Sequence, residues 1–190
     1  MDLDERPADI RTARLYLRAW RASDAAGLLP VLEANAAHLQ RWIPAHVASV
    51  APLHEIEERL HGFAADFAAA RAWRFGIFAP ADGDVYGEVD LFFRSDRERV
   101  QLAHADRVEI GYWLRSDLMG LGYATEAALA MVSLAERLSG MRHVEIRCDA
   151  RNARSAALPR RLGFHLAGGP ADASDPYAMV WIRALGGPAG

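Results

Sequence analysis

Two periodicities meet near the middle of the chain. From residue 107 to residue 115, apolar side chains alternate with polar or small ones, which is the period of a half-buried strand. From residue 122 to residue 138, apolar side chains recur every three or four positions, as on one face of a helix. Between them lies Met119-Gly120-Leu121-Gly122, whose glycines let backbone N–H groups gather at a helix start. Because unsatisfied N–H donors and the helix dipole favour an anion there, this junction predicts a phosphate-binding turn.

The remaining pattern predicts an α/β fold with a mixed, mostly antiparallel sheet. The turn-forming residues 81–84 indicate a hairpin, and the polar segment 96–106 indicates a loop. The strand at 143–149 follows a strand–helix–strand crossover, so it should run parallel to the strand at 107–115. We expect Pro30 to kink or divide the helix in which it lies. The other predicted strands cover residues 9–20, 73–79, 85–93 and 176–184, and the other predicted helices cover residues 25–37, 52–70 and the segment after Asn152.

Length and composition fit one domain with a sizeable core. The chain has 190 residues, 52% of them hydrophobic, and its net charge of −3 argues against a general nucleic-acid binder. All 22 basic residues are arginine, which excludes sites that need a lysine: Walker-type phosphate loops, Schiff-base lysines and pyridoxal phosphate sites. We expect a single domain over residues 9–184, with flexible ends at 1–8 and 185–190.

Cysteine, histidine and apolar runs limit the function further. The single cysteine, Cys148, cannot form an intramolecular disulfide or a multi-cysteine zinc site. The seven histidines lack metal-ligand spacing, so we expect no metal. The first residues are charged, unlike a secretory signal, and no apolar run approaches the ~20 residues of a membrane span. These features favour a cytoplasmic location.

The central segment also resembles a known family. E-I-G-Y-W-L at 109–114, followed by G-L-G-Y-A-T-E-A at 120–127, is similar to the GCN5-related N-acetyltransferases (GNAT), in particular to the RimJ/RimL-like branch that acetylates the N-termini of ribosomal proteins. T-x-R-L-x-L-R at 12–18 and N-x-x-S…L-G-F at 152–164 extend the match from about residue 10 to residue 182. The resemblance implies a GNAT fold, with helices flanking the sheet and a central pair of parallel strands that splay apart around the pantetheine arm of acetyl-CoA.

The resemblance implies that acetyl-CoA docks at the glycine turn. The family pattern Gln/Arg-x-x-Gly-x-Gly/Ala falls on Met119, Gly122 and Ala124, and Met119 departs from it because a thioether cannot donate a hydrogen bond. Arg115 or Arg154 could replace the missing polar side chain. A bare strand–helix turn and a dinucleotide site are the alternatives; the second fits poorly, since one β-α-β unit is evident rather than a repeated series. The residues expected to bind acetyl-CoA are Tyr112, Trp113, Leu114, Gly120, Leu121, Gly122, Tyr123, Ala124, Thr125, Asn152 and Ser155.

Acetyl transfer to an amine also needs a base and a proton donor. Glu109 stands where many GNAT enzymes keep a glutamate that takes the amine proton, and an ion pair with an arginine is the alternative. Glu88 and Asp90 are alternates on the neighbouring strand and could also attract a cationic acceptor. The position of the tyrosine that many members use as the proton donor is Pro159 here. Ser155 is therefore left to protonate the departing thiolate, unless it is an ordinary first-turn serine, and we expect a helix bend at Pro159 that aims it.

Residues 35–44 resemble the segment that forms part of the acceptor site in this family. His38 and Trp42 are expected to contact the acceptor there, although Trp42 could simply pack in the core. Cys148 lies near the splayed strands and suggests a covalent acetyl-enzyme, but a lone strand cysteine is usually a small buried hydrophobe.

These features predict an acetyl-CoA-dependent N-acetyltransferase that acts by direct attack in a ternary complex. The acceptor expected first is a protein N-terminus. A small-molecule amine, either an antibiotic or a metabolite, comes second, and a non-catalytic acyl-CoA-binding module is the outside alternative. We expect no direct nucleic-acid or membrane partner, and a monomer or a homodimer. The acceptor is not written in the sequence, because pocket loops carry no readable code.

Overall fold

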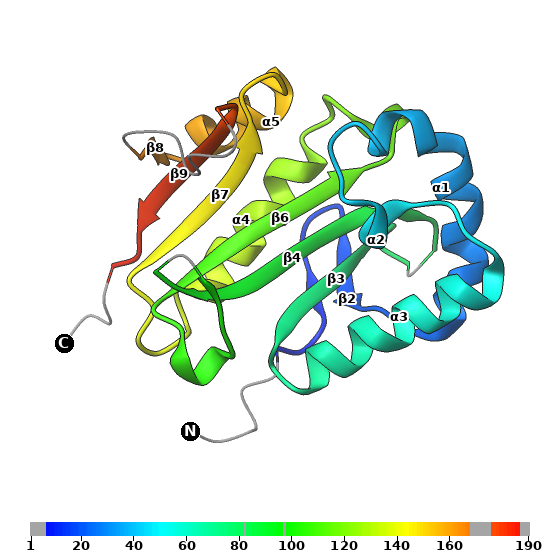
Figure 1. Ribbon diagram of the computed structural model, residues 1–190, viewed down its shortest axis with the longest axis horizontal. Helices are drawn as coiled ribbons and strands as arrows, with labels where there is room; N and C mark the ends of the chain where they lie inside the picture. Colours follow the sequence, from blue (N-terminus) through cyan, green and yellow to red (C-terminus); the bar gives the residue numbers. More distant parts are fainter. Residues whose placement is uncertain (1–6, 82, 97, 168–175, 187–190) are drawn as a thin grey trace.

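The computed structural model describes residues 7–81, 83–96, 98–167 and 176–186. Within these residues nine strands form one sheet, in the order β1-β2-β3-β4-β6-β7-β9-β8, with β5 paired to β4 (Figure 1). The pairs are antiparallel except for β6 and β7, so the predicted mixed sheet is confirmed. The strands are β1 (Ile10–Arg11), β2 (Tyr16–Ala19), β3 (Ala72–Phe78), β4 (Val85–Ser95), β5 (Glu98–Arg99), β6 (Arg107–Leu114), β7 (His143–Asp149), β8 (His165–Leu166) and β9 (Ala178–Ala184).

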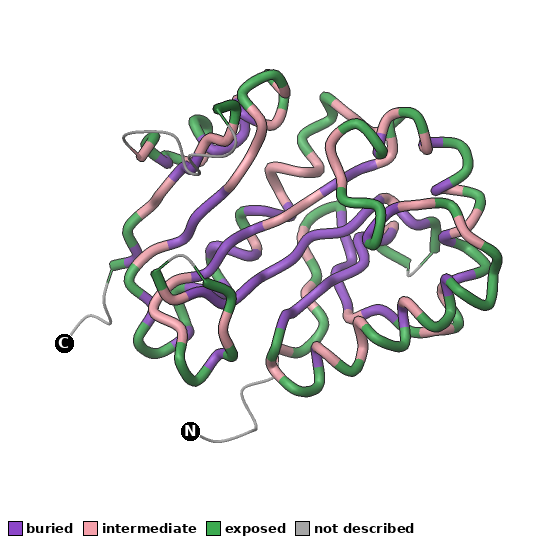
Figure 2. The backbone as a smooth tube through the Cα atoms, viewed as in Figure 1, coloured by how far each residue is buried: buried purple, intermediate pink, exposed green. Residues whose placement is uncertain are grey.

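Helices cover both faces of this sheet, because alternate strand residues point to opposite sides. Trp113 packs with the apolar residues of α1, α2 and α3, whereas its neighbour Leu114 packs with those of α4. The central strands β3 and β4 are buried along nearly their whole length (Figure 2). The α-helices are α1 (Ala25–Leu39), α2 (Ala45–Ala48), α3 (Leu53–Ala68), α4 (Tyr123–Ala135) and α5 (Ala153–Arg161), with short 3₁₀ turns η1 (Ala22–Asp24), η2 (Leu102–His104) and η3 (Ser116–Leu118).

The first strand was predicted wrongly as a single element over residues 9–20. The chain instead turns back at Thr12, whose hydroxyl accepts a hydrogen bond from the Leu15 backbone N–H at 3.0 Å, and forms the hairpin β1–β2. Alternation of apolar residues does not reveal such a turn, because a hydroxyl bonded to the backbone three residues on reverses the chain without a glycine or proline. The turn matters for the site described below.

Two other local predictions compare with the structure as follows. Pro30 does not divide α1, which runs unbroken to Leu39, because the buried face of the helix outweighs the one backbone bond that the proline removes; the alternative outcome, a kink, stays a prediction. The polar segment 96–106 is not all loop, because Glu98–Arg99 pairs with the end of β4 and Leu102–His104 forms η2. The flexible ends predicted at 1–8 and 185–190 fall largely outside the described residues.

The central parallel pair forms a fork. Strands β6 and β7 pair from Arg107↔His143 to Ile110↔Ile146, and beyond these residues the two strands no longer pair with each other. Each continues on its outer side, β6 against β4 and β7 against β9. The predicted splayed parallel pair is therefore confirmed.

A single amide ties helix α1 to the segment that follows β6. The Asn35 Oδ1 atom accepts hydrogen bonds from the backbone N–H and the hydroxyl of Ser116, both at 2.8 Å, while its Nδ2 atom donates to the Val31 carbonyl. Asn35 is buried, so these bonds form away from water. They fix the end of α1 relative to the turn that leads into α4.

No helix of the described chain is long and apolar enough to cross a membrane.

Candidate active site

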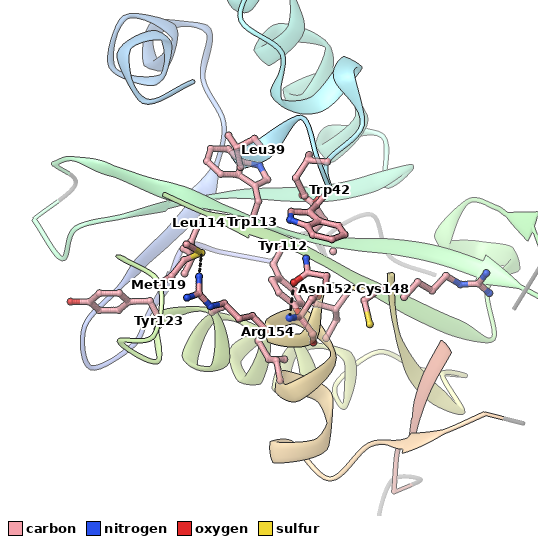
Figure 3. Close-up of a pocket in the computed structure, with 18 of the residues that line it drawn as sticks. Leu39, Trp42, Tyr112, Trp113, Leu114, Met119, Tyr123, Cys148, Asn152 and Arg154 are labelled. Carbon is pink, nitrogen blue, oxygen red and sulfur yellow. Dashed lines mark hydrogen bonds between the residues drawn. The ribbon is translucent and has the colours of Figure 1, made fainter. Parts of the chain in front are cut away.

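A pocket of about 1380 Å³ lies at the fork between β6 and β7. Its walls come from the end of α1 and the segment before α2, from β4 and β6, from the start of α4, and from β7 with the start of α5 (Figure 3). All but two of the predicted site residues line it: Leu121 and Glu88 do not. Segments that are far apart in the sequence thus build one cavity.

The glycine turn lies at one end of this pocket, which we call the phosphate end because the sequence predicts a phosphate there. Gly120 and Gly122 have φ angles of +80° and +86°, a region that side-chain-bearing residues rarely adopt. Gly122 is the N-cap of α4, so the first N–H groups of the helix have no intrahelical partner. Tyr123, Ala124 and Thr125 line the pocket at this end. Together with the positive end of the helix dipole, these N–H groups suit a phosphate.

Arg14 holds this turn from the β1–β2 hairpin, and sequence reasoning did not single it out. Its Nη1 atom donates to the Leu121 carbonyl at 2.9 Å, and its Nε and Nη2 atoms each contact Glu126 at 2.7 Å. Thr12 donates its hydroxyl to the same carboxylate at 2.6 Å, and the Arg14 guanidinium stacks over the Tyr123 ring. The Arg14 side chain is 46% exposed and lines the pocket, so it also brings positive charge to the phosphate end. The T-x-R-L pattern was the one sequence feature that included Arg14, and it does not indicate that Arg14 pairs with Glu126, 112 residues away.

The structure distinguishes between the two arginines expected to compensate for Met119. Arg115 is paired with Asp117 at 2.7 Å and lies outside the pocket lining, so it does not serve this purpose. Arg154 reaches across the pocket from α5, and its Nη1 atom lies 3.7 Å from the Met119 sulfur (Figure 3). The guanidinium of Arg154 therefore stands beside the position where the family pattern places a Gln or Arg.

Ser155 lies at the other side of the fork, in the first turn of α5. Its backbone N–H donates to the Asn152 side chain at 3.1 Å, an N-cap bond, and its hydroxyl lies 3.0 Å from that of Tyr112. Burial raises the pKa of Tyr112 to about 12, so the phenol keeps its proton and remains a hydrogen-bond donor.

Pro159 lies inside α5, where the sequence predicts a helix bend, and that bend stays a prediction. The helix continues to Arg161, with the proline in its last turn. The proline has no N–H for the Ser155 carbonyl, and that carbonyl accepts a hydrogen bond from the Tyr112 hydroxyl instead, at 3.2 Å. The proline thus frees the backbone atom that binds Tyr112.

Glu109 is a buried carboxylate surrounded by arginines. Its Oε2 atom lies 2.9 Å from Arg94 Nη1 and 3.5 Å from Arg147 Nε, and its Oε1 atom lies 3.4 Å from Arg99 Nη2. The side chain also lines the pocket. The ion-pair alternative for Glu109 is therefore present in the structure, and it coexists with access to the cavity.

The two acidic residues of β4, Glu88 and Asp90, differ in whether they reach the pocket. Glu88 is buried outside the pocket lining, where it accepts a hydrogen bond from Trp20 Nε1 at 2.7 Å and pairs with Arg74 at 3.3 Å. Asp90 is also buried, but it lines the pocket, and its Oδ1 atom has no partner in the described chain. Burial raises the pKa of Asp90 well above its usual range, and the nearby Glu88 adds to this while Arg74 opposes it.

Residues of the α1–α2 region form the opposite wall. Trp42 is half-buried, lines the pocket and lies outside both apolar cores, which agrees with a wall better than with core packing. His38 also lines the pocket, and burial lowers its pKa, with Arg154 contributing. Cys148 lines the fork, and burial raises the pKa of its thiol, which disfavours the nucleophilic thiolate.

Comparison with known proteins shows the family of this chain. A family model described as an acetyltransferase (GNAT) domain matches residues 14–165. The chain belongs to the GNAT family. This GNAT chain is an N-acetyltransferase by family, which confirms the predicted class of enzyme. No curated protein matches its sequence.

Solved structures of other GNAT enzymes share the fold over nearly the whole chain. The RimL ribosomal L7/L12 alpha-N-protein acetyltransferase in complex with coenzyme A has a TM-score of 0.76 and 22% identity, covering 94% of this chain and 98% of its own. An acetyltransferase from Salmonella typhimurium that modifies the N-terminal serine of the L7/L12 protein has a TM-score of 0.74 and 22% identity, covering 94% and 100%. The microcin C7 self-immunity acetyltransferase MccE, in complex with acetyl-CoA and AMP, has a TM-score of 0.77 and 18% identity, covering 97% and 100%. At these identities, the likeness establishes a common fold.

Proposed function

We propose that this GNAT enzyme transfers the acetyl group of acetyl-CoA directly to the amino group of a protein N-terminus. The observation that carries the proposal is the continuity of one pocket. It joins the N-terminus of α4, the β6–β7 fork and the carboxyl groups of Asp90 and Glu109. A phosphate group, a thioester and an amine with its base can therefore lie in one cavity.

In this proposal acetyl-CoA enters with its pyrophosphate on the glycine turn. The first N–H groups of α4 bind it, and Arg14 and Arg154 flank it with positive charge. The pantetheine arm then follows the fork, between Tyr112 and Leu114 on β6 and Asn152 at the start of α5. Arg154 takes over the role of the polar side chain that Met119 cannot supply.

The transfer is a direct displacement. The neutral amine attacks the thioester carbonyl carbon, the C–N bond forms, and the C–S bond breaks as coenzyme A leaves as a thiolate. Glu109 accepts the proton that the amine loses, and Asp90, a carboxyl group that lines the same cavity and whose pKa is raised by burial, is the alternative base. The Ser155 hydroxyl, held 3.0 Å from Tyr112, gives its proton to the thiolate and recovers one from solvent. The raised pKa of Cys148 favours this direct route over an acetylated cysteine.

The acceptor lies between the carboxyl groups and the wall formed by His38 and Trp42. A protein N-terminus is proposed first because ribosomal-protein acetyltransferases share the fold over nearly the full chain. A small-molecule amine is the second candidate, since MccE, whose structure contains AMP beside acetyl-CoA, shares the same fold. The proposal places the reaction in the cytoplasm, where both kinds of acceptor meet acetyl-CoA.

A screen for thiol release tests this proposal. The protein is incubated with acetyl-CoA and a panel of N-terminal peptides and small amines, and the free thiol is measured over time. We expect release that depends on one class of amine and yields an acetylated product by mass spectrometry. Binding of acetyl-CoA by calorimetry without release for any amine would favour a non-catalytic acyl-CoA-binding module instead.

A further inference from the structure

Positive charge gathers in the pocket, against the overall charge of the chain. Among the described residues, eight arginines but four carboxyl groups line the cavity, whereas the whole chain carries a net charge of −3. Some of this charge belongs to the phosphate end, where Arg14 and Arg154 lie. A separate group lies at the base of the fork, on β3, β5, β6 and β7. We call it the basic floor, and it consists of Arg74, Arg99, Glu109 and Arg147.

The basic floor lies next to the site of transfer rather than at the phosphate end. Glu109 and Arg147 flank Ile110 and Ile146, the last residues that pair before the fork opens. Arg99 approaches the same carboxylate from the other side of β6, since β5 pairs with the end of β4. The basic floor is therefore close to the place where, in our proposal, the thioester meets the amine.

Two arginines of the basic floor, Arg99 and Arg147, keep N–H donors that their protein partners do not occupy, whereas Arg74 is buried and paired with Glu88 and Asp90. The one polar side-chain contact of Arg99 within the described chain is the 3.4 Å approach to Glu109, and its side chain is 52% exposed. It stacks over the Phe92 ring at 3.8 Å, which fixes the guanidinium plane while leaving its N–H edges open. Arg147 contacts Glu145 and Glu109 through Nε and Nη2, and it is 32% exposed. A guanidinium has five N–H donors, so both residues keep donors for a ligand.

The acidic groups of this end do not cancel that charge. Glu109 is one carboxylate shared among Arg94, Arg99 and Arg147. The carboxyl group of Asp90 is buried and lines the pocket, and its Oδ1 atom has no partner in the described chain. A buried polar atom without a partner costs free energy unless a ligand or water satisfies it.

We propose that the acceptor carries an oxyanion, a carboxylate or a phosphate, close to its amine, and that Arg99 and Arg147 bind this group. The proposal rests on the proposed function, because it names the class of amine that the same site takes. Two guanidinium groups at one wall suit the paired oxygens of such a group. The binding orients the amine toward the fork and Asp90, and it excludes cationic acceptors by repulsion.

Matched acceptors test the proposal. The peptide arm compares an N-terminal Ser-Asp peptide with its Ser-Asn and Ser-Lys analogues. The small-molecule arm compares phosphoethanolamine with ethanolamine. We expect the acid to exceed its neutral analogue in kcat/KM by about tenfold at low salt, since hydrogen bonds between charged groups are stronger than those between neutral groups. The preference should weaken as salt is added. A preference in one arm alone identifies the source of the anion, and no preference in either arm overturns the proposal.

Variants then assign the preference to residues. Arg99→Gln is the primary variant. The exposed Arg99 side chain makes a single, long polar contact, to Glu109, so its loss should leave folding intact. We expect it to remove most of the preference through KM for the acidic acceptor, with KM for acetyl-CoA unchanged. Arg147→Gln should act in the same direction. Arg142→Gln is the matched control, because that side chain is 77% exposed and lies outside the pocket. An unchanged preference in Arg99→Gln would overturn the assignment.

Calorimetry separates this proposal from the proposed function. The acetylated product peptides, acidic and neutral, are titrated into the protein loaded with coenzyme A. Tighter binding of the acidic product that is lost in Arg99→Gln supports the oxyanion site even if no turnover is found. Turnover without any preference for the acid would leave the proposed function standing and remove the oxyanion site.

Discussion

The two ends of the pocket are built in different ways. The phosphate end is made mainly of backbone, from one short continuous segment, with two glycines at φ near +80° and the first turn of α4. The acceptor end is made of side chains from β3, β4, β5, β6 and the α1–α2 region. Backbone N–H groups are common to every residue type, whereas a wall of side chains changes with each substitution. One end can therefore keep a common co-substrate while the other is adapted to a particular acceptor.

If the two ends of the pocket act separately, variants at each end should change different kinetic parameters. Changes at the phosphate end should alter KM for acetyl-CoA, and changes at the acceptor end should alter kcat or KM for the amine. A variant that moves both sets of parameters equally would show that the two ends do not act separately.

The largest effect is expected for Glu109→Gln. Without a carboxylate to accept the amine proton, kcat should fall by roughly 10²-fold, the low end for a positioned base. The loss should shrink at high pH, where the amine is already neutral, and a pH–rate profile measures this. Glu145→Gln is the control, because Glu145 also contacts Arg147 but does not line the pocket. Equal, pH-independent losses in both variants would assign Glu109 to the ion-pair network alone.

Gly122→Val should raise KM for acetyl-CoA by about tenfold. A side chain at a φ of +86° is strained by about 1–3 kcal/mol, and its Cβ atom would lie 3.3 Å from Arg14 Nη2. Gly140→Val introduces similar strain at a φ of +81°, outside the pocket, and so controls for a general loss of stability. Unchanged acetyl-CoA affinity in a folded Gly122→Val protein, measured by calorimetry, would refute the docking assignment.

Ser155→Ala should lower kcat by up to about tenfold while acetyl-CoA affinity stays the same. The hydroxyl matters mainly as the thiolate departs, and water can replace part of its role, so the effect falls below that of a typical general acid. Tyr112→Phe, which removes the hydroxyl 3.0 Å away, should give a smaller loss in the same direction. Wild-type turnover by Ser155→Ala, with chemistry shown to be rate-limiting, would make it an ordinary first-turn serine.

Arg14→Ala should raise KM for acetyl-CoA about fivefold with little change in kcat. The variant removes the bond to the Leu121 carbonyl and the pairing with Glu126 that support the glycine turn. Arg11→Ala is the matched control, since Arg11 lies in the same hairpin, stacks over Tyr16 and does not line the pocket. Steady-state kinetics at saturating acceptor compare the two, and a similar KM change in both would indicate a general loosening of the hairpin.

The smallest effect concerns stability at the acceptor end. In the unfolded chain Asp90 ionises near its ordinary pKa of about 3.9, whereas its pKa is raised in the folded protein. The folded state therefore binds more protons between these two pKa values, and the free energy of unfolding falls as pH rises through that window. Asp90→Asn should reduce this slope, because Glu88, whose pKa is also raised by burial, contributes a slope of the same sign, and it should make the protein more stable than the wild type at neutral pH. Urea denaturation at several pH values measures it, and parallel pH profiles for the two proteins would contradict it.

The fold and the position of the glycine turn could be predicted because their signals are local. Strand alternation, helix period and the glycine turn all lie within short windows, and the crossover rule then fixes the parallel pair. Local sequence patterns did not predict structure that depends on a residue far away in the sequence. Thr12 bonds Leu15 and Glu126 at once, and the resulting hairpin is invisible to periodicity.

The acceptor end was harder to predict because access depends on the tertiary structure. Glu88 and Asp90 are two residues apart on one strand and so share a face, yet Glu88 is closed off by Trp20 and Asp90 opens into the pocket. The approach of Arg99 to Glu109 depends on the short strand β5, in a segment that composition alone marks as loop. Nothing in the sequence of either element identifies its partner.

The carboxylate of Glu126 has a consequence beyond catalysis. It joins the amino-terminal hairpin, through Thr12 and Arg14, to α4, whose first turn is the proposed phosphate site. Ordering one of these parts must therefore favour ordering of the other, and thermodynamic linkage makes the coupling equal in both directions. Acetyl-CoA should slow amide hydrogen exchange at residues 10–17, although the hairpin itself contributes a single side chain, Arg14, to the pocket. Conversely, disordering of the hairpin weakens acetyl-CoA binding by the same factor by which acetyl-CoA protects the hairpin.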